Sequence, residues 1–410
     1  MKRPYLFNIP LFSIRLLTFC LLALLISCST KEPSGIATIN ILDGLKTEKE
    51  FRLSEIVDDV EYVKLETTPE CLLSSAMYLV GKKYIVAVQP YGPAQVFLFD
   101  RSGKFLRKIG GEGKGPLEYV SISSVVTDPE ETYLLVNDYQ RDIIMKFDFD
   151  GKVILNYNNK EKLDADVSSM VIQSSDEIYL RMEYPRMEKK NFYLIRKMDA
   201  NFNQLDSLYP VNTSLIAGNG FYWGGSDFYL HNGSIQFRQF SFDTLYGDSK
   251  GKMIPRFNFP VGADHLPGPY LVSGLHKQMG DYTSTLNFTE LSEYLILNTR
   301  IVPKKGGVML YNKQSGEIAL LKKYPPCPPD TLGRRAILND IDGIVNPRSV
   351  TEDRGICVMT NQVIDLKDNI LNSCPEVQEI KFPAKRQEFI GLINASKEDD
   401  NPILQIFLLR

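Results

Sequence analysis

Apolar and polar residues alternate in short runs along most of the chain, and the runs come in pairs joined by a turn. Residues 96–110, VFLFDRSGKFLRKIG, form one such pair around Gly103. Alternation on both sides of a Gly or Asn turn is the signature of a β-hairpin. Looser copies of this hairpin occupy residues 144–158, 194–209, 243–259 and 308–324.

The hairpins recur with a nearly regular period. Equivalent strand positions lie 48, 51, 48 and 65 residues apart, at Phe99, Phe147, Met198, Tyr246 and Tyr311. Strand-like stretches such as TYLLVND and LSEYLILNTR lie between the hairpins, so each repeat predicts a four-stranded sheet. A period near 50 residues of strands and turns is typical of propeller blades. The predicted fold is all-β, a six-bladed β-propeller of four-stranded antiparallel blades.

The ends of the chain predict how the ring closes. LQIFLLR at the C-terminus has the pattern of a strand without a neighbouring partner, and residues 36–65 form a lead-in that packs along the rim or completes a blade. We therefore expect one blade to combine strands from both ends, which removes free sheet edges. Sustained helical periodicity is almost absent, so we expect almost no helix.

The first residues have the pattern of an export signal. An apolar run at residues 16–26 follows Arg15 and ends in LISC, residues 25–28, which resembles the bacterial lipobox. It is too short to span a bilayer comfortably. We expect a signal peptide at residues 1–27, lipidation of Cys28, a flexible tether at residues 28–35, and a single propeller domain at residues 36–410. A plain secretory peptide that happens to contain a cysteine is the alternative.

Three stretches of the body carry a family resemblance: GEGKGPLEY at residues 111–119, FDTLYGDSKGKMIPRFNFPVG at residues 242–262, and LNDIDG at residues 338–343, followed near the end by DDNPILQIFLL. With the lipobox, they make the chain similar to the six-bladed β-propeller lipoproteins of Bacteroides and its relatives. That resemblance implies the propeller fold and an anchor in the outer membrane, but no activity. The family often places a second Gly and Trp-Pro after N-D-I-D-G, whereas this chain has GIVNP.

Composition and charge argue against nucleic acid and zinc as partners. The net charge is −3 without a basic stripe, which argues against nucleic acid. Only three histidines are present, and no cysteine pair has C-x-x-C spacing, so we expect no zinc site. Two arrangements of the remaining cysteines are open. Cys357 and Cys374 form a disulfide, or these two residues, Cys71 and Cys327 are four separate thiols. GEGKGPLEY lacks the spacing of a phosphate-binding loop, so we expect a crossing between blades.

Two groups of residues are candidates for ligand contact. In NDIDG, Asn339, Asp340 and Asp342 would contact a ligand or calcium, or else form a turn in which these side chains bond the local backbone. The only tryptophan, Trp223, lies in FYWGGSDFY and would stack on a sugar ring or fill space between blades. Arg238 and Tyr246 follow at strand spacing and would point into the channel.

Two classes of function remain. The first is a binding module of the cell envelope that holds a glycan, a peptide or a partner protein at the channel mouth, without a cofactor. The second is a hydrolase or lyase that uses carboxylates at that mouth, an idea that rests on analogy of fold alone. No nucleophile motif is present, which favours the first class. Periplasmic and surface-facing orientations are both open.

Overall fold

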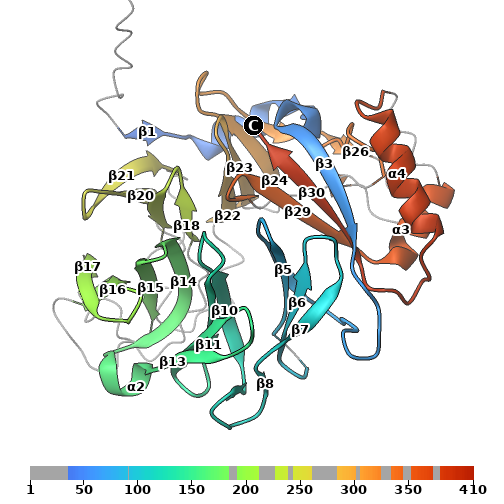
Figure 1. The fold of residues 1–410 in the computed structure, drawn as a ribbon. Coiled ribbons are helices and arrows are strands. Elements are labelled where there is room, and N and C mark those ends of the chain that lie inside the picture. The colour runs from blue at the N-terminus through green and yellow to red at the C-terminus, as the bar shows by residue number, and fades with distance from the viewer. Residues whose placement is uncertain are drawn as a thin grey trace, which may run out of the picture. The chain divides into compact units, whose positions relative to one another are not determined.

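The computed structural model describes residues 36–90, 92–183, 192–211, 227–238, 243–260, 284–301, 305–324, 334–344, 352–372 and 379–410. Residues Thr38–Arg410 belong to one compact unit. Within the described part of this unit, six sheets, each built on four antiparallel strands, are arranged in a ring as the blades of a propeller (Figure 1). This confirms the predicted fold class.

The blades follow one another along the chain, and each contributes consecutive strands. Blade 1 is β4 (Met77–Val80), β5 (Tyr84–Gln89), β6 (Gln95–Asp100) and β7 (Phe105–Ile109). Blade 2 is β10 (Ile122–Thr127), β11 (Tyr133–Asp138), β12 (Ile143–Asp148) and β13 (Val153–Asn158). Blade 3 is β14 (Asp166–Ser174), β15 (Glu177–Glu183), β16 (Phe192–Met198) and β17 (Gln204–Val211). Blade 4 is β18 (Asp227–His231), β19 (Ser234–Arg238), β20 (Thr244–Ser249) and β21 (Lys252–Asn258).

The last two blades involve the lead-in. Blade 5 is β22 (Ser284–Glu290), β23 (Tyr294–Ile301), β24 (Lys305–Asn312) and β25 (Ile318–Leu321), with the short β2 (Glu48–Lys49) added in parallel to β25. Blade 6 is β28 (Glu352–Asp353), β29 (Ile356–Asn361), β30 (Ile403–Leu409) and β3 (Val57–Lys64). Because β3 pairs with β30, strands from both ends of the chain form one sheet, as predicted (Figure 1).

An aspartate at the start of the turn holds the outer hairpins of blades 1, 2 and 3 and helps to explain why they recur. Asp100 Oδ1 accepts the N–H groups of Ser102 and Lys104 at 2.9 and 3.1 Å, and Asp199 Oδ1 does the same for the residues two and four positions on, at 2.8 Å each. Gly103 adopts φ of +89°, and a Cβ there would lie 2.3 Å from the Lys64 carbonyl oxygen. The local sequence therefore fixes these turns.

The glycine-rich stretch at residues 111–119 is a connection between blades 1 and 2, as predicted. Its ends form a short parallel pair, β8 (Gly111–Glu112) and β9 (Glu118–Tyr119). The buried Tyr119 hydroxyl donates to the Ile109 carbonyl at 2.7 Å and accepts the Val96 N–H at 3.0 Å. The tyrosine thereby ties the crossing to blade 1.

The prediction of almost no helix was wrong at two places near the end of the chain. Helices α3 (Val363–Asn372) and α4 (Pro383–Asn394) lie between β29 and β30, and short helices occur as η1 (Ile41–Lys46), η2 (Leu53–Glu55) and α2 (Asn159–Lys162). Helix α4 buries only Phe389 and Ile393, too few apolar positions to reveal its period, and Phe389 stacks on Tyr62 at 4.3 Å. Among the described helices, none is long and apolar enough to cross a membrane.

Candidate functional site

A cavity of about 500 Å³ lies where hairpin turns of blades 4, 5 and 6 meet. Each turn joins the first two strands of its blade, so all three turns belong to the same side of the ring. The end of β30 and the residues after η2 complete the walls. The lining residues are Glu55, Ile56, His231, Asn232, Gly233, Glu290, Leu291, Ser292, Glu293, Tyr294, Arg354, Gly355, Leu409 and Arg410.

Two of these turns have positive φ at both central residues. The values are 50° and 68° for Asn232-Gly233, and 51° and 80° for Arg354-Gly355. This backbone suits a two-residue hairpin and favours Asn-Gly, so arginine at the first position is strained. The Arg354 guanidinium donates to the Thr127 carbonyl of blade 2, and its Nη1 lies 3.4 Å from the Thr127 hydroxyl. The strained turn therefore places a guanidinium that links blade 6 to blade 2.

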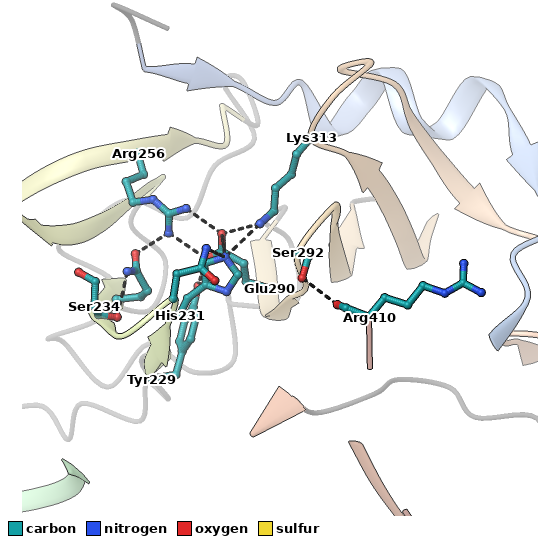
Figure 2. Close-up of polar contacts among 10 residues, drawn as sticks. Tyr229, His231, Ser234, Arg256, Glu290, Ser292, Lys313 and Arg410 are labelled. Carbon is teal, nitrogen blue, oxygen red and sulfur yellow. Dashed lines mark hydrogen bonds and ion pairs between the residues drawn. The ribbon is translucent and has the colours of Figure 1, made fainter. Parts of the chain in front are cut away.

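The wall between blades 4 and 5 contains a buried charge cluster centred on Glu290 (Figure 2). Glu290 Oε1 accepts from Arg256 Nη2 and Lys313 Nζ, both at 2.8 Å. Its Oε2 accepts from Arg256 Nη1 at 2.9 Å and from the Tyr229 hydroxyl at 2.8 Å. His231 Nε2 lies 3.3 Å from Glu290 Oε1 and 3.4 Å from Lys313 Nζ. We call these five residues the Glu290 cluster.

A glycine lets one member of the Glu290 cluster reach it from the far edge of blade 4. Arg256 lies on β21, while Tyr229 and His231 lie on β18 at the opposite edge of the same sheet. A Cβ on Gly247 of the intervening β20 would lie 2.5 Å from Arg256 Cδ. Arg256 Nη1 also donates to Gln236 Oε1 of β19 at 2.5 Å. The arginine therefore crosses the sheet face over a position without a side chain.

The electrostatics of the cluster leave it with an excess of positive charge. Burial would raise the pKa of the Glu290 carboxyl, but the hydrogen bonds and charges of Arg256 and Lys313 outweigh burial and lower that pKa to about 2. Burial, assisted by Lys313 and Arg256, lowers the pKa of His231 to about 4 although Glu290 opposes the shift. Burial also lowers the pKa of Lys313. Near neutral pH, one carboxylate therefore faces two cations and an uncharged imidazole.

Arg410 places a guanidinium at the rim of the cavity, where Asp58 balances its charge. Its Nε donates to Asp58 Oδ1 at 2.7 Å, and its carbonyl oxygen accepts from the Ser292 hydroxyl at 3.1 Å. Within the described residues, its two terminal guanidinium nitrogens have no hydrogen-bond partner. The side chain is 49% exposed, so those nitrogens can meet a ligand.

The predicted acidic group lies elsewhere, in a buried turn packed against β3 and η2. Asp342 Oδ2 accepts from the Tyr62 hydroxyl and from Gln405 Nε2, both at 2.8 Å, and its Oδ1 accepts from Asn339 Nδ2 at 2.8 Å. Asp340 accepts the N–H and the hydroxyl of Ser54 at 2.9 and 2.5 Å. The geometry favours the turn over the ligand or calcium interpretation. Throughout the described residues, no group of three or more His, Cys, Asp or Glu side chains could hold a metal ion.

The other predicted contact residues lie in separate places. Arg238 is buried at the end of β19, where its Nε donates to Asp227 Oδ2 at 2.7 Å and its guanidinium lies 5.3 Å from the Phe288 ring. Tyr246 of β20 packs edge-on against Tyr209 at 5.0 Å and lines a second, more open cavity of about 490 Å³. Trp223 and Cys28 lie outside the described residues.

The cysteines are placed only in part. Cys71 is a buried thiol whose Sγ donates to the Glu66 carbonyl at 3.1 Å, and Cys357 is buried on β29. Cys327 and Cys374 lie outside the described residues, so the Cys357–Cys374 pairing stays a prediction.

Sequence reasoning did not find the Glu290 cluster. Its members come from four separate elements of blades 4 and 5, and no short motif contains more than two of them. One local signal exists, since His231 directly precedes the Asn-Gly turn and so lies at a hairpin end. Nothing in the sequence around Glu290 or Lys313 distinguishes them from solvated charges.

Comparison with known proteins agrees with the ring of blades. The sequence model of a domain of unknown function, DUF4934, matches residues 36–407. A candidate exported protein from Bacteroides fragilis shares 18% identity at a TM-score of 0.62, over 92% of this chain and 100% of that one. A DUF4221 family member from Bacteroides vulgatus shares 12% identity at a TM-score of 0.48, over 86% of this chain and 97% of that one. No curated protein matches the chain. At such identities the similarity shows the fold alone.

Proposed function

Because the chain belongs to the DUF4934 family, whose function is not established, we propose its function from its own fold and site: it is a lipid-anchored binding protein of the bacterial cell envelope. The observation that carries this proposal is the cavity framed by the turns of blades 4, 5 and 6. Such a cavity is large enough for a small ligand or for the end of a glycan or peptide. The exported relative from Bacteroides fragilis supports an envelope location.

The anchor follows from the sequence LISC at residues 25–28. Cleavage before Cys28 and its lipidation would tether the propeller through residues 28–35 to the outer membrane, on its periplasmic or its outer face. More than one acyl chain would make that attachment stable. Replacing Cys28 by Ala should abolish incorporation of a labelled fatty acid and release the protein from the membrane fraction. Labelled, membrane-bound C28A would contradict the anchor.

The alternative, a hydrolase or lyase with carboxylates at the channel mouth, has less support. The carboxylates of Asp340, Asp342 and Glu290 are buried, and each accepts hydrogen bonds from protein donors. A catalytic acid or base must instead reach a proton of the substrate. These groups therefore suit structure and charge balance better than proton transfer.

Binding is tested with the full chain in detergent micelles and a panel of neutral and acidic oligosaccharides, short peptides, muropeptides and calcium. A ligand that binds the folded state should raise the unfolding temperature, in proportion to its concentration over its Kd. Ser292→Trp would fill the cavity rim and should abolish the shift. Ser102→Trp, at an exposed turn of blade 1, is the matched control and should preserve it. No shift from any panel member would overturn small-ligand binding.

A further inference from the structure

The Glu290 cluster does not balance its own charge. Arg256 and Lys313 each make an ion pair with Glu290 at 2.8 Å, and the side chain of Lys313 is only 15% exposed. His231, whose Nε2 lies 3.3 Å from Glu290 Oε1 and 3.4 Å from Lys313 Nζ, is uncharged near neutral pH. Within the described residues, no other acidic side chain forms an ion pair with Arg256 or Lys313. A buried charge without a counter-charge is costly, so an anion in the adjoining cavity would offset that cost.

We infer that the cavity binds a small carboxylate-bearing ligand, an inference that rests on the binding function proposed above. The carboxylate would meet the terminal guanidinium nitrogens of Arg410 in a forked contact at the rim, and the excess charge of the Glu290 cluster would attract it from the wall that His231 and Glu290 line. An arginine fork matches the two oxygens of a carboxylate. Ser292 holds the Arg410 backbone at 3.1 Å and so helps to position this residue.

The remaining charges of the cavity are compatible with this ligand. Glu55 is engaged through Oε1 with the Arg52 N–H at 3.0 Å, and Glu293 is exposed at the rim, where water screens it. Arg354 is balanced by Asp353 at 3.8 Å and already donates to Thr127, so it adds no excess charge and makes no new contact. Glu293 and Asp58, the partner of Arg410, are thus exposed to solvent, whereas the excess positive charge of the Glu290 cluster lies in the buried wall.

The apolar part of the lining indicates what carries the carboxylate. Leu409 offers partly exposed aliphatic surface, with the more buried Ile56 and Leu291 also in the lining. Tyr294 is 8% exposed, and its ring packs edge-on against Phe51 at 4.9 Å. Among the described lining residues, no aromatic face is therefore open for a sugar ring. An aliphatic or peptidic framework fits this surface better than a pyranose.

The test measures binding to the full chain in detergent micelles by calorimetry, with N-acetyl-Ala-Ala, its C-terminal amide and glucuronate as probes. We expect the dipeptide carboxylate to bind at least about tenfold more tightly than its amide, which differs only in the charge. Glucuronate should bind more weakly than the dipeptide. Tighter binding of glucuronate would keep the carboxylate site but overturn the peptidic framework.

Two substitutions locate the contact. Arg410→Gln should weaken the dipeptide by about tenfold, and Lys313→Met, which removes the excess charge, should weaken it by a similar factor. Arg107→Gln is the matched control, because Arg107 is similarly exposed (44%) and paired with Asp150 at 3.0 Å; it should change nothing. Equal affinity for carboxylate and amide, or equal effects of Arg410→Gln and Arg107→Gln, would overturn the inference. If the panel above yields another ligand that Ser292→Trp abolishes, the binding function survives that failure.

Discussion

Two carboxylates of this propeller, Asp342 and Glu290, are equally buried, yet their surroundings act in opposite directions. Asp342 accepts hydrogen bonds from uncharged donors, namely Tyr62, Gln405, Asn339 and a backbone N–H, and burial raises its pKa. Glu290 accepts from two cations, which lower its pKa to about 2. Uncharged donors satisfy a carboxylate without neutralising it. Two cations neutralise Glu290 and leave one excess positive charge. Of the two carboxylate sites, only that of Glu290 lies beside the cavity.

The largest effect expected from this comparison is that of Glu290→Gln. The change leaves Arg256 and Lys313 partly buried without their anion, which should cost about 3–5 kcal/mol of the free energy of unfolding. Asp342→Asn removes no counter-charge and mispairs some uncharged donors, so it should cost about 1–3 kcal/mol. Urea unfolding at neutral pH measures both. A loss for Asp342→Asn equal to that for Glu290→Gln would break the comparison.

A matched control separates burial from side-chain chemistry. Glu293 lies three residues beyond Glu290, at the exposed rim of the same cavity. Glu293→Gln should change the free energy of unfolding by less than about 0.5 kcal/mol. A larger effect would mean that the rim carboxylate, rather than the buried one, balances the charges of this site.

Acidification should lower the free energy of unfolding by up to about 3 kcal/mol through His231. Its pKa in the folded state is about 4, below the ordinary 6.5. Between these pH values His231 is protonated in the unfolded chain but not in the folded chain. The free energy of unfolding should therefore fall as the pH drops from 6.5 to 4. His231→Gln carries no such proton and should flatten this part of the profile. Identical profiles for both proteins would exclude His231 as the cause.

The difference between the Asp342 turn and the Glu290 cluster also shows which parts of the structure the sequence can predict. The blades were predictable because each hairpin is local: the Asp100 turn and its copies lie within a few residues, and the pairing of β30 with β3 follows from two unpartnered strands. The Asn339–Asp342 turn was visible for the same reason. The Glu290 cluster was not, because Arg256 approaches across a whole sheet and Lys313 comes from another blade. Helix α4 was missed because it buries only Phe389 and Ile393, and α3 because its ten residues are a short window in which to recognise a helical period.

Of the changes expected to destabilise the protein, Gly247→Ala has the smallest effect, and it sharpens the comparison by testing how Arg256 reaches Glu290. Gly247→Ala would place a Cβ 2.5 Å from Arg256 Cδ and 2.8 Å from Gln236 Oε1, so both side chains must shift. We expect a loss of about 1–2 kcal/mol in urea unfolding, since overpacking typically costs that much. Gly111→Ala, with no atom within 4 Å of the new Cβ, should be nearly neutral. In a Glu290→Gln background, Arg256 has already lost its ion-pair partner and keeps Gln236, so Gly247→Ala should cost less there, because residues of one network couple. Equal costs in both backgrounds would mean that the glycine serves only sheet packing and not the charge cluster.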